Sequence, residues 1–564
     1  MDSSSASQPN RPLPLAALVC LAGAFACSAA ILLLFQSHLT FVVDDWEFLI
    51  DRRGSSAAVY LDPHNEHIAV APVAIYKALL ALFGMSSAFP FAVVGTFIFL
   101  LSVVLLFVYL RRRVGYWMAL LGSVLILFLG AAWSDLLWSF QMGFSGSVAA
   151  GIGALLALER DDLKGDLAAC ALLVVAISFS ELGVPFALGA LVSVALGPSE
   201  GGWRPQAVLR RLYVALLPLA LYGIWYLGWG HKAPHTMTFH NVLNSPRFVF
   251  DAVSANLASL FGLTTPLSGN VGPNNIGLNW GRILVVIAIV LAIWRLRRMG
   301  WPSRWLWVVV AAGAAFWFLT AFNAIPYKRE PVTGRYQYPG AIFVLLIAAE
   351  FLRGVRFDRR ALAAATVVTV AAAVSGYFSL HDGYRLRKFI TDMDRGTLTG
   401  AEIARGHMNS FSVIQLVTST PPIPASSYFS AVDAFGSPAF IVSELAASDE
   451  VARAAADKLL AEAEDVKLAP HAGQGPRAGS PCRSQPGWSH PGSRALALRP
   501  GDYTVRTQKA QTIYAARFAD DASATLGDLA PGAVGALRVP ADLSKRPWRL
   551  ETSGAVTLCK VGGS

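Results

Sequence analysis

Long apolar runs, separated by short polar clusters, are the main pattern along the N-terminal part of the chain. Charged residues are absent over residues 12–43, 78–110, 114–134 and 136–158, and further uncharged runs follow as far as 361–381. An apolar run of about 20 residues is long enough to cross a bilayer as a helix. The pattern therefore predicts an α-helical polytopic membrane protein.

Eleven membrane helices are predicted from these runs. We place them at about 13–36, 89–110, 115–133, 143–158, 166–180, 183–198, 212–229, 281–295, 304–322, 338–353 and 361–378. They form an expected membrane domain over residues 1–378, with residues 379–564 as a separate C-terminal domain.

The distribution of Lys and Arg predicts the orientation of the helices. With the N-terminus in the cytoplasm, the short inner loops hold most of the cations, as the positive-inside rule requires. The longest outer loops are then 37–88 and 230–280, and the first is predicted to contain an amphipathic surface helix at 67–83. An odd number of crossings places the C-terminal domain outside the cell membrane.

The C-terminal domain changes from a helical to a strand pattern. Residues 438–465 are rich in Ala, Glu, Asp and Lys, which favours helix, and a Gly/Pro/Ser-rich linker follows at 471–494. Short alternating runs over about 494–564 then predict a small β-sandwich, so that the domain as a whole is of the α+β type. Its two cysteines, Cys482 and Cys559, suggest a disulfide if the domain is extracytoplasmic.

Composition supports the membrane class and excludes others. Of 564 residues, 54% are hydrophobic and 15% are charged, against about 25% charged in soluble domains. The net charge of +10 lies mostly in clusters between apolar runs, which orient helices and do not indicate nucleic-acid binding. A soluble enzyme, a disordered regulator and a nucleic-acid reader are excluded for the whole chain.

An acidic pair, Asp44-Asp45, stands where the first helix leaves the membrane, followed by Trp46. A carboxylate held at the apolar boundary can act as a general base. Two adjacent carboxylates can alternatively bind a divalent cation. A solvated helix end is the third interpretation.

A second polar cluster reads Asp62-Pro63-His64-Asn65-Glu66-His67. His64 and His67 are spaced i,i+3, so on one helical face they could bind a metal together with Glu66 or Asp62. Local hydrogen bonding and helix capping by Asn65 explain the same residues without a metal.

Single acidic residues interrupt two otherwise apolar regions. Asp135 lies in an outer loop with Trp138 and Gln141, and Glu181 lies between two adjacent predicted helices. Ionisable residues at membrane depth usually face a cavity or a charged partner. The tryptophan is also the expected anchor at a membrane interface.

The last outer loop carries cations against the positive-inside rule: Lys328, Arg329 and Arg335, the last followed by Tyr336. A phosphate-bearing ligand explains them, because guanidinium binds phosphate in bidentate fashion. Lipid headgroups or outer carboxylates are alternative partners. Since no nucleotide-binding motif is present and an outer site has no access to cytosolic nucleotides, an activated substrate would arrive on a lipid.

These features together resemble the GT-C class of membrane glycosyltransferases, over about residues 13–378. The acidic pair, the long first outer loop with its surface helix and the short inner loops are shared, although many relatives have Asp-Glu in place of Asp44-Asp45. The segment 180–185 and Gly334-Arg335-Tyr336 are similar to segments of those families. The C-terminal domain is similar to that of actinobacterial cell-wall enzymes such as arabinofuranosyltransferases.

The resemblance implies inverting transfer of a hexosyl or pentosyl group from a polyprenyl phosphate to a glycan, lipid or protein hydroxyl. Asp44 or Asp45 would act as the base. Arg335, with Lys328 or Arg329, would stabilise the departing phosphate. A divalent cation is the one cofactor left open.

Substrate binding would fall to the remaining polar and aromatic candidates. Flat surfaces for a sugar ring are offered by Trp46, Trp138 and Tyr336. The other candidates are His64, Glu66, His67, Asp135, Gln141 and Glu181. A transporter or flippase of lipid-linked or anionic solutes is the alternative function.

Overall fold

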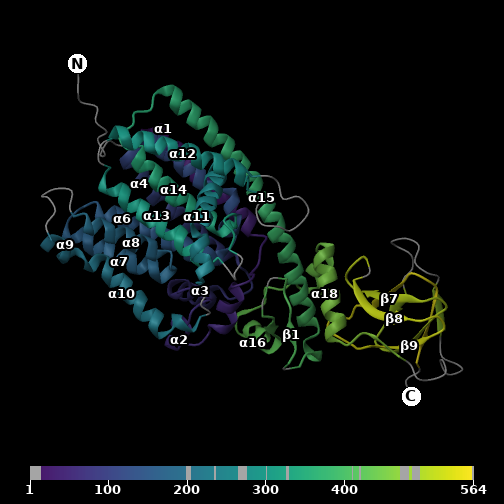
Figure 1. The fold of residues 1–564 in the computed structure, drawn as a ribbon. Helices are drawn as coiled ribbons and strands as arrows, with labels where there is room; N and C mark the ends of the chain where they lie inside the picture. The colour runs from purple at the N-terminus through teal and green to yellow at the C-terminus, as the bar shows by residue number, and fades with distance from the viewer. Residues whose placement is uncertain are drawn as a thin grey trace. The chain divides into compact units, whose positions relative to one another are not determined.

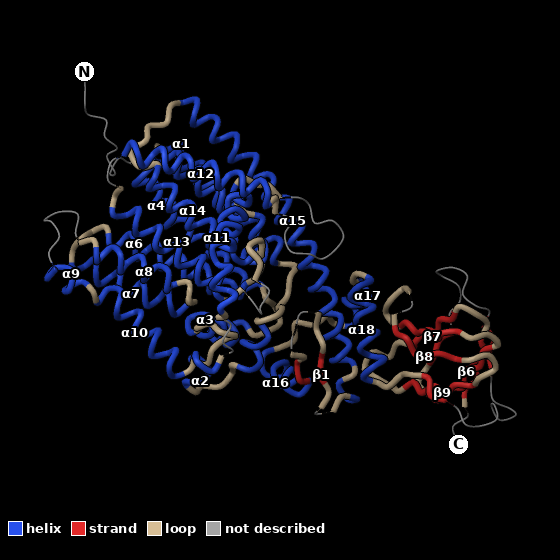
Figure 2. Tube along the Cα trace, in the orientation of Figure 1, coloured by secondary structure: helices blue, strands red, loops and turns tan. Residues whose placement is uncertain are grey.

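The computed structural model describes residues 14–197, 205–233, 237–264, 276–299, 302–324, 329–409, 411–417, 419, 421–470, 482–485, 496–521 and 523–561. They form two compact units (Figure 1). The first comprises residues 14–38, 52–79 and 89–386, and the second comprises 39–51, 80–88 and the described residues from 387 onward. Helix α15 belongs to both units, and the strands lie in the second (Figure 2).

The first unit is a bundle of helices. Its helices are α1 (Leu15–Gln36), α2 (Ala57–Leu61), α3 (Val70–Phe83), α4 (Phe89–Leu127), α5 (Trp133–Leu136), α6 (Met142–Leu158), α7 (Leu163–Phe179), α8 (Gly183–Ala195), α9 (Pro205–Arg211), α10 (Tyr213–Gly228), α11 (Phe239–Leu260), α12 (Leu278–Met299), α13 (Arg304–Phe322), α14 (Gln337–Phe351) and α15 (Arg359–Ile403). The last turn of α3 and the last part of α15 fall in the second unit.

Six described helical segments are long and apolar enough to cross a membrane. They are Leu15–Gln36, Phe89–Leu127, Ser139–Leu158, Leu278–Arg298, Arg304–Phe322 and Arg359–Ile403. The chain thus has the character of a membrane-embedded helical protein with a β-rich C-terminal region.

The count of eleven spans is not reproduced by helix length. Helices α7, α8, α10 and α14 form where spans are predicted, but they have 17, 13, 16 and 15 residues, fewer than the ~20 that cross a bilayer. The predicted spans 89–110 and 115–133 start within a single helical segment, α4. Residues 111–113, between the two predicted spans, are helical, and the helix is broken at Gly115, whose φ of 80° favours glycine.

The segment 230–280, expected as a long outer loop, contains the 22-residue helix α11. Polar side chains of this helix are buried against other helices of the first unit. Asn241 donates to the carbonyl oxygen of Phe322 over 2.8 Å, and Asn256 donates to Gln337 Oε1 over 3.0 Å. Because α11 contacts the end of α13 and the start of α14, it packs on the bundle as a structural element.

Ion pairs join several helix ends on the cationic side of the bundle. Arg113, near the break in α4, pairs with Glu159 after α6 and with Glu350 in α14. Asp161, before α7, pairs with Arg211 before α10 and with Arg304 at the start of α13, at 3.2 and 2.6 Å. These contacts bring the ends that are rich in Arg together.

The second unit contains three further helices and two main sheets. Its helices are α16 (Ala425–Phe435), α17 (Val442–Ala447) and α18 (Glu450–Ala463). Its strands are β1 (Val413–Ile414), β2 (Ile423–Pro424), β3 (Leu468–Pro470), β4 (Cys482–Gln485), β5 (Leu496–Leu498), β6 (Gly501–Thr507), β7 (Gln511–Ala516), β8 (Ala524–Leu529), β9 (Val534–Val539), β10 (Trp548–Thr552) and β11 (Val556–Lys560). One sheet has the order β5-β10-β7-β8 and the other β3-β9-β6-β11-β4, with antiparallel pairing throughout.

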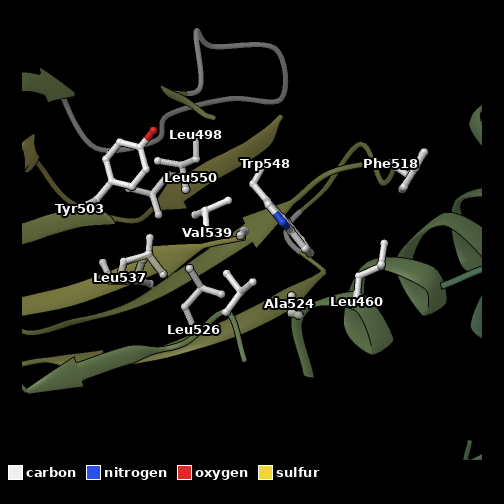
Figure 3. Packing of buried hydrophobic residues seen from close by; sticks show 14 of the residues in the cluster. Leu460, Leu498, Tyr503, Phe518, Ala524, Leu526, Leu537, Val539, Trp548 and Leu550 are labelled. Carbon is white, nitrogen blue, oxygen red and sulfur yellow. The ribbon is translucent and has the colours of Figure 1, made fainter. Parts of the chain in front are cut away.

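The two sheets share one hydrophobic core (Figure 3). On β9 of one sheet the buried Leu537 and Val539 are separated by the exposed Arg538, and Trp548 and Leu550 of β10 in the other sheet belong to the same core. Alternation with period two is what buries one face of each sheet. The β-sandwich is therefore the observed form of this region, with a disulfide between Cys482 on β4 and Cys559 on β11.

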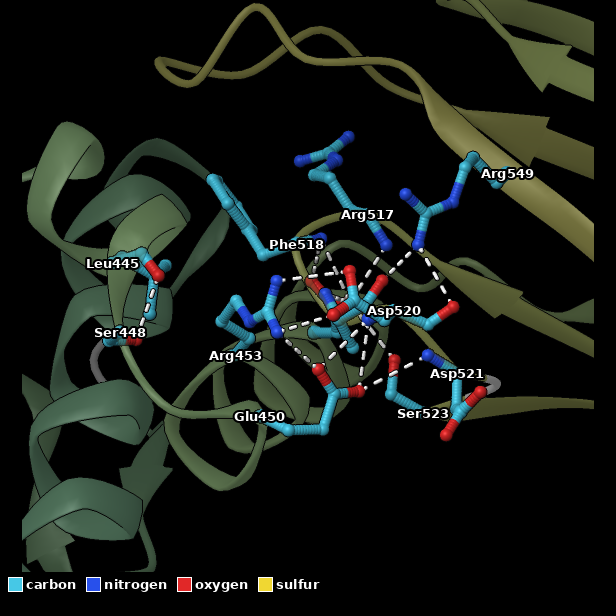
Figure 4. A network of polar contacts seen from close by, with 12 residues as sticks. Leu445, Ser448, Glu450, Arg453, Arg517, Phe518, Asp520, Asp521, Ser523 and Arg549 are labelled. Atoms are coloured by element: carbon cyan, nitrogen blue, oxygen red, sulfur yellow. Dashed lines mark hydrogen bonds and ion pairs between the residues drawn. The ribbon is translucent and has the colours of Figure 1, made fainter. Parts of the chain in front are cut away.

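Helix α18 is fixed to the sandwich by carboxylates (Figure 4). Asp457 accepts hydrogen bonds from the backbone N–H groups of Arg517, Phe518 and Ala519, and from the Ser523 hydroxyl. Glu450, the first residue of α18, accepts hydrogen bonds from the backbone N–H groups of Asp520 and Asp521 in the same loop. The loop between β7 and β8 is thus held by the helix.

Candidate functional site

A tight turn at residues 64–67 forms one side of the candidate site. The N–H of His64 donates to the carbonyl of His67 over 2.9 Å, and the N–H of His67 donates back over 2.8 Å. Asn65 has a φ of 52°, which its short polar side chain tolerates. The prediction that His64 and His67 share a helical face is therefore wrong.

The two imidazoles of this turn have different surroundings. The ring of His64 lies 4.9 Å from that of Phe140, and the residue is buried. His67 instead lines a cavity of about 290 Å³ in the first unit. Among the described residues, no group of three or more His, Cys, Asp or Glu side chains is placed to hold a metal ion.

The cavity lies at one end of the helix bundle. It is lined by the first turns of α6 and α8, the last turns of α10 and α13, and the loop before α14. Six residues predicted from the sequence line it: Glu66, His67, Glu181, Arg329, Arg335 and Tyr336. Residues more than 260 positions apart therefore contribute to one pocket.

Charged side chains of the cavity wall are linked in a row. His67 Nδ1 lies 2.5 Å from Glu181 Oε2, and His67 Nε2 lies 3.5 Å from Glu66 Oε1. Glu66 also forms an ion pair with Arg329. Both ring nitrogens of His67 thus face carboxylates, and Arg329 is held by a carboxylate of the wall.

Arg335 differs from Arg329 in its contacts. Its guanidinium carbon lies 5.2 Å from the ring centroid of Tyr336, and its Nε is buried without a hydrogen-bond partner among the described residues. Burial raises the pKa of Asp135, while the positive charge of Arg335 and the backbone N–H of Tyr338 act in the opposite direction. Arg335 therefore brings a positive charge to the pocket wall, and its Nε–H has no acceptor among the described residues.

A buried amide network positions the loop that carries Arg335. Gln337, which is fully buried, donates to the carbonyl oxygens of Pro331 and Thr333. Its Oε1 accepts from Asn256 and Ser259 of α11. Since both ends of the amide are satisfied, the loop is tied to α11 in one arrangement.

The acidic pair lies in the second unit, whereas the cavity lies in the first. Asp45 is buried, and its carboxylate accepts the N–H of Val42 over 2.9 Å, a contact within its own turn. Asp44 is half-buried. The ring centroid of Trp46 lies 6.1 Å from that of Tyr428 in α16. The structure thus gives Asp45 and Trp46 contacts within this unit.

The remaining predicted residues lie outside the cavity or outside the described residues. Asp135 and Trp138 border a separate void of about 10 Å³. Gln141 is buried beside them at the start of α6. Lys328 lies outside the described residues.

Several lining residues were not predicted. Tyr222 and Tyr226, spaced i,i+4 on α10, and Thr320 and Asn323 at the end of α13 all border the cavity. A tyrosine pair on one helical face was the available signal, but aromatic residues are enriched at the ends of membrane helices whatever the function.

No protein-family model matches the chain, and no curated protein sequence matches it. The function is therefore argued from the geometry of the pocket and the distribution of charge.

Proposed function

We propose that this protein is a glycosyltransferase of the cell membrane that transfers a sugar from a polyprenyl phosphate to a hydroxyl acceptor on the outer side. The observation that carries the proposal is the pocket at one end of the bundle, whose wall includes Arg335, a cation with an Nε that has no partner among the described residues. Guanidinium groups bind phosphate through parallel N–H donors. A lipid phosphate at the membrane boundary would supply the missing acceptor.

The size and lining of the pocket support a sugar-phosphate ligand. Its volume of about 290 Å³ is near the ~300 Å³ lower limit of small-molecule sites, which suits a headgroup whose lipid tail stays in the bilayer. Glu66 and Glu181 can accept hydrogen bonds from sugar hydroxyls. Tyr222 and Tyr336 add aromatic surface for the apolar face of a sugar ring.

The position of the pocket favours an enzyme over the alternative of a transporter or flippase. Transporters place their substrate sites near the bilayer midplane, at broken helices. Here Tyr222 and Tyr226 lie in the last two turns of α10, and Phe316 and Thr320 in the last two turns of α13. A site at helix ends suits chemistry at the membrane surface.

The orientation proposed is a cytoplasmic N-terminus and an extracytoplasmic C-terminal domain. The ion pairs of Arg113, Arg211 and Arg304 lie at the helix ends opposite those that form the pocket. Because cytoplasmic loops are rich in Lys and Arg, this end would face the cytoplasm. The pocket would then face outward.

The test measures binding of a polyprenyl phosphate that carries no sugar. Its result does not depend on which sugar the protein transfers. The full-length protein in detergent should bind this lipid and not the corresponding polyprenol. Arg335→Ala should weaken binding roughly tenfold to a hundredfold, the value of a charge-assisted hydrogen bond. Arg335→Lys should retain part of the affinity, since it keeps charge and loses the planar fork.

Arg247→Ala, on the exposed side of α11, is the matched control and should bind like the parent. Equal binding of polyprenyl phosphate and polyprenol by the parent would contradict the proposal. Equal binding by the parent and both Arg335 variants would place the phosphate elsewhere.

A further inference from the structure

The imidazole of His67 lies between two carboxylates on the wall of the pocket. Glu181 Oε2 is 2.5 Å from Nδ1, and Glu66 Oε1 is 3.5 Å from Nε2. The His67 side chain is 21% exposed, so the ring reaches the cavity while most of it is packed.

Backbone hydrogen bonds fix the turn that carries His67. His67 and His64 exchange two backbone hydrogen bonds across the turn, and Asn65 supplies the left-handed residue. Glu181 stands in the short link between α7 and α8, where the N–H groups of Gly183 and Val184 bond back to the link. The backbone of both residues is thus held in a defined turn, which favours a preorganised site.

We propose that His67 is the general base of the transfer reaction, with Glu181 as its positioning residue; this inference rests on the proposed function. With its proton on Nδ1, which lies beside Glu181 Oε2, the neutral ring has its lone pair at Nε2. That atom takes the proton of the acceptor hydroxyl while the acceptor oxygen bonds to the anomeric carbon. The bond from that carbon to the phosphate oxygen breaks, and its electron pair leaves with the polyprenyl phosphate.

The surrounding charges favour this proton transfer. Before the step, the lone pair of Nε2 faces the carboxylate of Glu66, a repulsive arrangement that Arg329 moderates by pairing with that carboxylate. After the step, the imidazolium lies between Glu66 and Glu181 and is attracted by both. Arg335 contributes at the opposite end of the reaction, where negative charge grows on the phosphate.

The experiment uses full-length protein in detergent with radiolabelled polyprenyl-phosphate hexoses and pentoses, and measures sugar release to water or to an octyl-glycoside acceptor. His67→Gln should lower the rate by roughly 10²–10⁴-fold, the usual contribution of a general base, with polyprenyl-phosphate binding unchanged. Glu181→Gln should lower the turnover rate and leave lipid binding unchanged. His240→Gln, on the exposed face of α11, should behave like the parent.

Rescue by added imidazole distinguishes a general base from a residue with a purely structural role. In His67→Ala, added imidazole should restore part of the rate in a saturable manner, because it can occupy the space of the lost ring. An active parent with an unaffected His67→Gln variant overturns this inference alone, as does loss of activity confined to Asp44→Asn or Asp45→Asn. A parent that binds no polyprenyl phosphate and releases no sugar overturns the proposed function and this inference together.

Discussion

Replacing Asp457 by Ala tests how strongly α18 holds the β-sandwich. The substitution removes an acceptor that is 0% exposed and serves three backbone N–H groups of residues 517–519. A buried donor left without a partner costs ~1–3 kcal/mol, so three of them cost at least about 3 kcal/mol. Because Ala is the better helix former by about 0.5 kcal/mol, we expect a net loss of about 2.5 kcal/mol or more.

Hydrogen exchange of the full-length protein, followed by mass spectrometry, measures this loss locally. A loss of about 2.5 kcal/mol corresponds to exchange roughly 60-fold faster in peptides from β7 and β10. Peptides from α6 in the first unit serve as the internal reference.

Glu450→Ala is the matched control, because this carboxylate also accepts two N–H groups of the same loop. Its side chain is 38% exposed, so water can replace it, and the expected loss is below about 1 kcal/mol. If the two substitutions accelerate exchange equally, burial of the donors does not set the cost, and the reasoning is refuted.

Two further predictions concern the first unit. Gly376→Ala places a Cβ that overlaps the carbonyl oxygen of Phe128. The melting temperature should therefore fall, with a loss of stability at the upper end of the ~1–3 kcal/mol that overpacking costs. The control Gly223→Ala adds a Cβ that meets no atom and should leave the melting temperature unchanged. With the free cysteines Cys20, Cys27 and Cys170 changed to Ser, His231→Cys should react with an impermeant maleimide in intact cells. Arg356→Cys should react only after the membrane is opened, and the reverse pattern would contradict the proposed orientation.

The helices that the sequence predicted best are those whose signal is local. Uninterrupted apolar runs predict α1, α6, α12 and α13 because the run itself supplies the hydrophobic surface. Helix α11 escaped prediction because it contains Pro246 and many polar residues, and its amides are satisfied by groups about 80 residues away. That information is not present in the local sequence.

The β-sandwich also contains both strands that the local sequence predicts and a strand that depends on its neighbours. The short alternating runs predict the sandwich as a whole, but β8 contains Gly527 and Asp528, residues that disfavour strands. It is held in the sheet by β7, across an irregularity in register between Ile513 and Tyr514. A strand of this kind depends on its neighbour more than on its own composition.

At the candidate site, the sequence identified charged residues and not their pairing. Glu181 and Arg335 stand out because a charge near apolar spans is costly unless it has a partner or a function. Their partners could not be predicted, since the turn of His67 and the link of Glu181 lie more than 100 residues apart. Tyr222 was missed because its residue type is ordinary for a helix end.

The polar contacts of α11 also constrain when the bundle can be completed during synthesis. Asn241 finds its acceptor at Phe322 and Asn256 finds Gln337, each 81 residues later in the chain. At ~5–20 residues per second, the ribosome needs roughly 4–16 s to make that length. Throughout this interval α11 is present without its partners, so its side-chain amides must remain hydrated. The loop that bears Arg335 is the last part of the pocket to be synthesised. The pocket is therefore assembled late, when α11 docks.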